Sequence, residues 1–80
     1  MIPFNKFKRF DVRDRLRNGI EPFLEIFQRV NALQPDEGLI IVAPFLPSPL
    51  IEKLGSEGFV SKVERGVGGD WIVYFWRAPV

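Results

Sequence analysis

Residues 39–49 constrain the fold of this 80-residue chain more than any other segment. Leu39-Ile40-Ile41-Val42-Ala43 is a continuous apolar run of strand length, which is typical of a strand buried on both faces or paired on both edges. The six residues that follow, 44–49, include three prolines, which disfavour both a helix and a β-ladder. The segment therefore predicts an interior strand that ends in a stiff loop.

Helical spacing of apolar residues appears on both sides of this strand. A first amphipathic helix is expected from Pro22 to about Gln34, and the turn at residues 35–38 ends it. A shorter second helix is expected from Ser48, as its N-cap, to near Gly58. The apolar stripes are formed by Phe23, Ile26, Phe27, Val30 and Leu33 in the first helix and by Leu50, Ile51 and Leu54 in the second.

Three further strands are predicted from alternating or continuous apolar patterns. Residues 6–12 place Phe10 and Val12 on one face and Phe7 on the other, residues 59–65 alternate, and residues 71–76 form the last strand after a hairpin loop. Residues 13–21 are interpreted as a polar, charged connection that ends in Asn18-Gly19.

The predicted fold is a single α+β domain over residues 1–80, with residues 1–5 as a loose tail. Its order is strand, helix, strand, helix, strand, strand. The first two strands should be parallel with a right-handed crossover, and the last two should form an antiparallel hairpin. Both helices then cover one face of a four-stranded mixed sheet, giving a two-layer α/β sandwich.

The last strand is apolar on both faces, and two explanations stay open. Either it is central and the chain itself covers its second face, or that face contacts another molecule. Likewise, Phe45 and Leu46 either form an apolar contact held on the stiff proline loop or, for Phe45, close the end of the core. The candidate interaction surface consists of Phe45, Leu46, Trp71, Tyr74 and Trp76.

Several functional classes conflict with the composition. The chain has no Cys, His or Thr, which excludes thiol chemistry, imidazole acid–base catalysis and Cys or His metal sites. Ser48 has no histidine to activate it as a nucleophile. No catalytic residue, cofactor or metal is therefore expected, and the chain is interpreted as a cytoplasmic protein without a membrane span.

Charge is distributed unevenly along the chain. Residues 1–20 carry a net charge of +4 and the remaining sixty a net charge of −3. A solvated strand edge and loop explain the basic segment most simply, and an anion-binding or nucleic-acid-binding site is the alternative. The candidate anion site comprises Arg13, Arg15, Arg17, Gly19, Glu21 and Pro22, at the start of the first helix.

Four short motifs occur in an order that resembles a known group of small domains. They are Asp11-Val12-Arg13, Glu21-Pro22-Phe23, Leu33-Gln34-Pro35-Asp36-Glu37, and residues 42–50 with the sequence Val-Ala-Pro-Phe-Leu-Pro-Ser-Pro-Leu. Together with Gly69-Asp70-Trp71, they resemble a cysteine-lacking family of unknown function related to the TusA/SirA-like sulfur carriers. The resemblance covers roughly residues 8–77.

The resemblance implies a βαβαββ fold, shared with the C-terminal domain of bacterial translation initiation factor three. In TusA-type proteins a cysteine that opens the first helix carries a persulfide, and Gly19 occupies that position here. Since glycine cannot carry sulfur, the expected function is a non-catalytic interaction or accessory domain, with sulfur or redox metabolism as the implied context. The partner would be another protein or a second copy of the chain, and nucleic-acid or small-anion binding through residues 6–17 is the alternative.

Overall fold

The structure, a computed structural model, describes residues 2–78. The order of strands and of the two longer helices is as predicted from the sequence. A 3-10 turn, η1, begins inside the predicted N-terminal tail. In chain order the elements are η1 (Phe4–Lys6), β1 (Phe7–Asp11), α1 (Arg13–Arg17), α2 (Phe23–Asn31), β2 (Gly38–Ala43), α3 (Ser48–Ser56), β3 (Phe59–Arg65), η2 (Val67–Gly69) and β4 (Trp71–Arg77).

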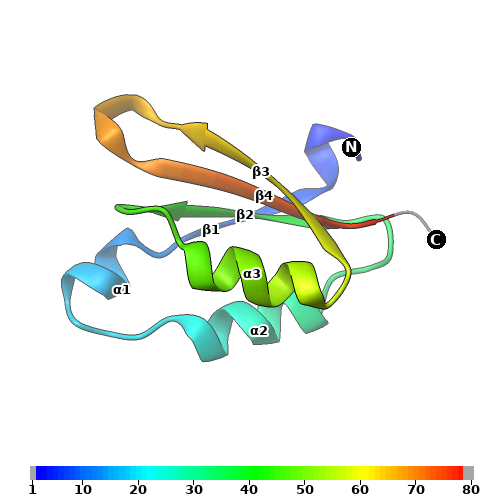
Figure 1. Ribbon diagram of the computed structural model, residues 1–80, viewed down its shortest axis with the longest axis horizontal. Coiled ribbons are helices and arrows are strands. Elements are labelled where there is room, and N and C mark those ends of the chain that lie inside the picture. The colour runs from blue at the N-terminus through cyan, green and yellow to red at the C-terminus, as the bar shows by residue number, and fades with distance from the viewer. Residues whose placement is uncertain (1, 79–80) are drawn as a thin grey trace.

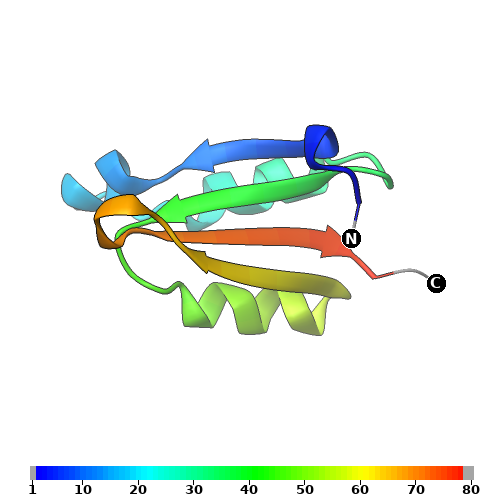
Figure 2. The same ribbon diagram turned by 90° about the horizontal axis from the view of Figure 1, so that it is seen from above.

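The four strands form one mixed sheet in the order β1-β2-β4-β3 (Figure 2). β1 and β2 are parallel, and β4 is antiparallel to both β2 and β3. The predicted parallel pairing of the first two strands and the predicted hairpin of the last two are therefore both confirmed. The apolar last strand lies in the sheet interior, where both of its edges are hydrogen-bonded.

The helices α2 and α3 cover the same face of the sheet (Figure 1), and α1 lies at the end of β1. This arrangement is the predicted two-layer α/β sandwich of the α+β class. Within residues 2–78, no α-helix covers the opposite face, which we call the open face. No helix in this part of the chain has the length and apolar character needed to cross a membrane.

The hydrophobic core lies between the sheet and the helices. Phe10 and Val12 both enter it, as their shared face in the sequence predicts. Every residue of β2 is buried, including those on the open face, which agrees with the continuous apolar run. The other core side chains come from α2 (Ile26, Val30), β2 (Leu39, Ile41, Ala43), α3 (Leu50, Leu54) and the β3–β4 pair (Phe59, Val73, Phe75), with Leu33 after α2.

The predicted connection at residues 13–21 contains a short helix that the sequence analysis did not predict, because Arg13–Arg17 forms α1. The Asp11 carboxylate accepts a hydrogen bond from the Arg13 backbone N–H at 3.0 Å, which holds the first turn in place. Leu16 packs against the core one turn after Val12. The sequence did not predict this helix because five residues are too few to show a repeating spacing of apolar residues.

Two predicted helix boundaries also differ from the structure. The first helix ends at Asn31 rather than near Gln34, and the Leu33 N–H donates to the Val30 carbonyl at 3.2 Å, a three-residue hydrogen bond that tightens the chain after the last turn. Ser48 is the first residue of α3 and not its N-cap; Pro47 holds the cap position, with no capping side chain. The Ser48 N–H donates instead to the Leu46 carbonyl at 2.9 Å, within the proline loop.

Candidate functional site

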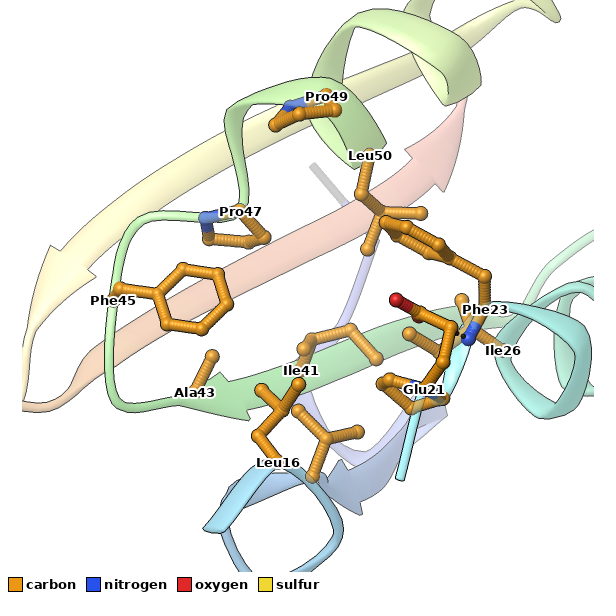
Figure 3. Close-up of a pocket in the computed structure, with 12 residues that line it drawn as sticks. Leu16, Glu21, Phe23, Ile26, Ile41, Ala43, Phe45, Pro47, Pro49 and Leu50 are labelled. Atoms are coloured by element: carbon orange, nitrogen blue, oxygen red, sulfur yellow. Dashed lines mark hydrogen bonds between the residues drawn. The ribbon is translucent and has the colours of Figure 1, made fainter. Parts of the chain in front are cut away.

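An apolar pocket lies where β1 and β2 end and where α2 and α3 begin (Figure 3). Its volume is about 250 Å³. The carboxyl ends of parallel strands are the usual ligand-binding edge of such sheets. The pocket is lined by Val12, Leu16, Glu21, Pro22, Phe23, Ile26, Ile41, Ala43, Phe45, Pro47, Pro49 and Leu50.

Four separate segments build the walls of this pocket, which we call the junction pocket. Leu16 comes from α1 and Ile26 from α2, and Ala43 is the last residue of β2. The proline loop, residues 44–49, forms the remaining wall, and its fixed φ angles keep that wall rigid. The pocket is therefore largely preformed, so a ligand would need little reordering of the chain to enter.

Glu21 is the one charged residue among those that line the junction pocket. Its Oε1 accepts a hydrogen bond from the Phe23 backbone N–H at 2.9 Å, which satisfies a donor at the start of α2. Figure 3 shows the carboxylate directed toward the pocket. The same carboxylate thus supports the helix start and presents negative charge to a bound group.

Exposed apolar side chains surround the junction pocket. Phe45 is 51% exposed and Leu46 is 39% exposed, so Phe45 lines the pocket without closing the end of the core. Of the nine large apolar side chains that are exposed among the described residues, five belong to residues 20–24 and 45–46, which border the pocket. Such clustering is typical of a binding surface rather than of scattered exposed residues.

A shallow apolar groove continues from the pocket between α2 and α3. Phe23, Pro49 and Leu50 line both hollows, and the groove adds Phe27 and Lys53. The Phe23 and Phe27 rings stack with centroids 6.3 Å apart, which holds this wall of the groove. Pocket and groove together form one continuous apolar surface.

Arg13 from the predicted anion site is held between two carboxylates. Its Nε and Nη2 atoms donate to Asp11, and its Nη1 donates to Asp70 Oδ2 at 2.6 Å. These hydrogen bonds lower the pKa of Asp11 to about 2, although partial burial opposes the shift. The hydrogen bonds to Asp11 and Asp70 raise the pKa of the Arg13 guanidinium above its ordinary value.

Arg15 and Arg17 are also paired with carboxylates. Arg15 donates two hydrogen bonds to Glu25, at 2.7 and 3.0 Å, and these lower the pKa of the Glu25 carboxyl. Arg17 donates to Asp14 at 2.8 Å. The Arg15–Glu25 pair is part-buried and links α1 to α2, whereas the Arg17–Asp14 pair is exposed, so solvent screens its charges.

Gly19, Glu21 and Pro22 from the candidate anion site lie at the turn before α2 and at its start. Gly19 has a φ of 75°, which glycine adopts without strain, and it serves the turn after α1. Pro22 precedes α2 at the cap position, where the Glu21 carboxylate already accepts the Phe23 N–H. The arginines of this segment are all paired, so the structure brings these residues close without forming a basic anion cradle.

The aromatic residues of β4 lie apart from the junction pocket. Tyr74 and Trp76 are on the open face, where the Phe7 ring meets them edge-on at centroid distances of 5.3 and 6.1 Å. All three are half-buried, so the chain covers much of this face itself. Burial raises the pKa of the Tyr74 phenol, and the nearby Glu64 carboxylate adds to the shift. Trp71 lies under the Arg65 guanidinium, 4.1 Å from the ring centroid.

Most of the pocket residues were missed by the sequence analysis. Of the candidates named there, Glu21, Pro22 and Phe45 line the pocket. One local pattern could have predicted the wall that α1 contributes to the pocket. Val12 and Leu16 are apolar and four residues apart, directly after a strand, which is helical spacing. Within residues 2–78, no group of three or more acidic side chains is arranged to hold a metal ion.

Comparison with known families decides where this fold belongs. Residues 9–77 match the family described as an uncharacterized conserved protein, DUF2249. The chain belongs to this family. The matched residues include all four strands except the first two residues of β1, and they include every residue that lines the junction pocket. The sheet and the pocket therefore both belong to the DUF2249 domain of this chain. No curated protein and no solved structure matches the chain.

Proposed function

We propose that this DUF2249 domain is a non-catalytic protein-interaction domain whose partner inserts one apolar side chain into the junction pocket. The observation that carries the proposal is the pocket itself, apolar except for Glu21 and bordered by exposed apolar residues. Its 250 Å³ lies just below the range of about 300–1,000 Å³ that is typical of sites for drug-sized ligands. A single aromatic or branched aliphatic side chain fits this size.

The lining of the pocket supports binding rather than catalysis. Acid–base catalysis places a titratable group within reach of the proton that moves, and nucleophilic catalysis also needs a nucleophile that is activated by its surroundings. Glu21 is the one titratable side chain in the lining, and the remaining walls are hydrocarbon. These walls can exclude water and select by shape, which is what an accessory or adaptor domain needs.

We further propose that the family is distantly related to the TusA/SirA-like sulfur carriers and that its partners belong to sulfur or redox metabolism. Support comes from the order of the strands and the two longer helices, which is βαβαββ apart from the short α1, and from the helix that begins after Glu21-Pro22. Gly19, where the resemblance places the carrier cysteine, lies in an exposed turn beside the junction pocket. Under this proposal the surface around the former carrier site keeps a binding role without sulfur chemistry.

Nucleic-acid or small-anion binding stays the alternative prediction, and we do not favour it. Its support is the net charge of +4 in residues 1–20. The pairing of Arg13, Arg15 and Arg17 with carboxylates leaves less positive potential for phosphate. Titration with phosphate would shift the amides of residues 18–23 if the alternative held.

Photocrosslinking in cells tests the interaction proposal. A benzophenone amino acid at position 45 stands at the pocket mouth and should form an adduct with one partner protein or with a second copy of the chain. Mass spectrometry of the adduct identifies which of the two it is. Ala43 projects into the pocket (Figure 3), so Ala43→Val should fill the space and lower the adduct yield by about fivefold or more.

The matched control carries the same photocrosslinker at position 67. Val67 is fully exposed in η2 and does not line the junction pocket. Its adducts, if any, should not depend on Ala43→Val. The proposal fails if position 45 gives no adduct, or if the filled pocket leaves the adduct unchanged while the circular dichroism spectrum shows a folded protein.

A further inference from the structure

We infer that the partner side chain in the junction pocket is an aromatic or branched aliphatic residue immediately flanked by Lys or Arg. The inference rests on the proposed function and adds the partner's chemistry. Glu21 is its basis, because it is the single charged group in an otherwise apolar lining. A partner that fills the pocket with hydrocarbon therefore meets a carboxylate beside it.

The carboxylate of Glu21 has capacity for a second partner. Oε1 accepts the Phe23 N–H, and a carboxylate offers further lone pairs on both oxygens. Within residues 2–78, Glu21 forms no ion pair. The nearby cations Arg15 and Arg17 are directed to Glu25 and Asp14. Glu21 thus places one formal negative charge, without a cationic partner among the described residues, at the mouth of the pocket.

The two ends of the apolar surface differ in charge. Glu21 at the pocket end forms no ion pair within residues 2–78, whereas Lys53 at the groove end pairs with Glu57 at 3.4 Å, which balances its charge. A partner segment that lies along both hollows would therefore find a better electrostatic match with its cation at the pocket end. The charges therefore favour one of the two orientations in which a partner segment could lie along the pocket and the groove.

The apolar walls favour an aromatic or branched aliphatic anchor. Phe45 and Phe23 offer ring faces on either side of the pocket, and Leu16 and Leu50 supply aliphatic surface (Figure 3). An alanine side chain would leave most of the 250 Å³ empty and would forfeit the dispersion contacts. The large apolar side chain is therefore required for binding, and the adjacent cation strengthens it.

Three blocked tetrapeptides test the inference: Gly-Phe-Lys-Gly, Gly-Phe-Glu-Gly and Gly-Ala-Lys-Gly. Binding is followed by the NMR shifts of amides in Leu16, Phe45 and Leu50. The Phe-Lys peptide should bind about two- to fivefold more tightly than the Phe-Glu peptide, the range expected for a solvent-exposed ion pair. The Ala-Lys peptide should cause no shifts.

Glu21→Gln should abolish the preference between the two Phe peptides. The variant keeps a side-chain oxygen that can accept the Phe23 N–H, so α2 should still begin normally. The matched control is Glu52→Gln, because Glu52 is exposed on α3 and lines neither the pocket nor the groove. This control should retain the preference.

The possible failures are distinguishable. If the Phe-Glu peptide binds as tightly as the Phe-Lys peptide, the inferred cation is wrong while the apolar pocket remains a binding site. A preference that survives in Glu21→Gln has another origin and also overturns the inference. If neither Phe peptide shifts the pocket amides, the proposed function itself is lost.

Discussion

Arg13 has the most connected side chain at the end of the sheet. It joins Asp11, the last residue of β1, to Asp70, which directly precedes β4. Because Asp11 also accepts the Arg13 backbone N–H, one carboxylate organises the end of a strand and the start of α1. The conformation of the chain between β1 and α1, beside the pocket, thus depends on the charged groups of Asp11, Arg13 and Asp70.

The Asp11 carboxylate should make stability depend on acidic pH. Its pKa is about 2 in the folded chain and 3.8 ordinarily, so the folded state binds the proton less strongly than the unfolded state does. The stabilisation is complete above about pH 4 and is lost as pH falls toward 2. With allowance for solvent screening, we expect a contribution of about 1–2 kcal/mol.

Urea unfolding of the wild type and Asp11→Asn between pH 7 and pH 2 measures this contribution. The variant should be less stable at neutral pH, and the difference should disappear by about pH 2. Asp14→Asn is the control, because the Asp14 side chain is 84% exposed and should change stability by no more than about 0.5 kcal/mol. A constant difference between wild type and Asp11→Asn at all pH values would contradict the assignment.

At the scale of elements, β2 depends on a glycine at its first position. A Cβ atom on Gly38 would lie 2.6 Å from the Phe75 carbonyl oxygen and 2.5 Å from the Phe7 ring. β2 is hydrogen-bonded on both edges and cannot easily move away. Gly38 therefore permits the close approach of β4 on one side and of the Phe7 ring on the open face.

Gly38→Ala should destabilise the fold by about 1–3 kcal/mol, the usual cost of added atoms in a packed core. Gly55→Ala is the matched control in α3, where a Cβ atom would meet nothing within 4 Å. It should stabilise the protein by up to about 1 kcal/mol, because alanine favours the helix. Guanidinium unfolding curves compare the two, and equal effects would contradict the role assigned to Gly38.

At the scale of the whole molecule, the two sheet faces are covered by different means. Two helices cover one face, whereas on the open face β2 is buried beneath neighbouring side chains and Phe7 packs on Tyr74 and Trp76. Of the two explanations for the apolar last strand, this arrangement supports coverage by the chain itself. The junction pocket is consequently the better candidate for the partner surface.

Phe7→Ala tests whether this aromatic cluster serves the fold. Because Phe7 is half-buried, its removal should lower the free energy of unfolding by about 1–3 kcal/mol, less than for a fully buried ring. The sedimentation coefficient should not change. Phe4→Ala, at a 69% exposed position, is the control and should alter stability by about 0.5 kcal/mol or less. An unchanged stability together with a lower sedimenting mass would instead identify the cluster as an interface.

The sequence by itself determined the strands, the two longer helices, the parallel pairing of β1 with β2 and the hairpin of β3 with β4, whereas the pairing of β4 with β2 came from the tertiary structure. Those features follow from local patterns: the alternation around Phe10, the helical spacing from Phe23, and the continuous run of residues 39–43. The handedness of crossovers then leaves few ways to connect them. A short helix such as α1 has too few residues to produce such a pattern.

The junction pocket and the ion pairs around it were decided by the tertiary structure alone. The pocket draws on four segments between Val12 and Leu50, and no local pattern shows which of their side chains will meet. Arg13 likewise finds Asp70 across 57 positions of sequence. The net charge of a segment therefore predicted an anion site, whereas folding placed each arginine against a carboxylate and left Glu21 facing an apolar pocket.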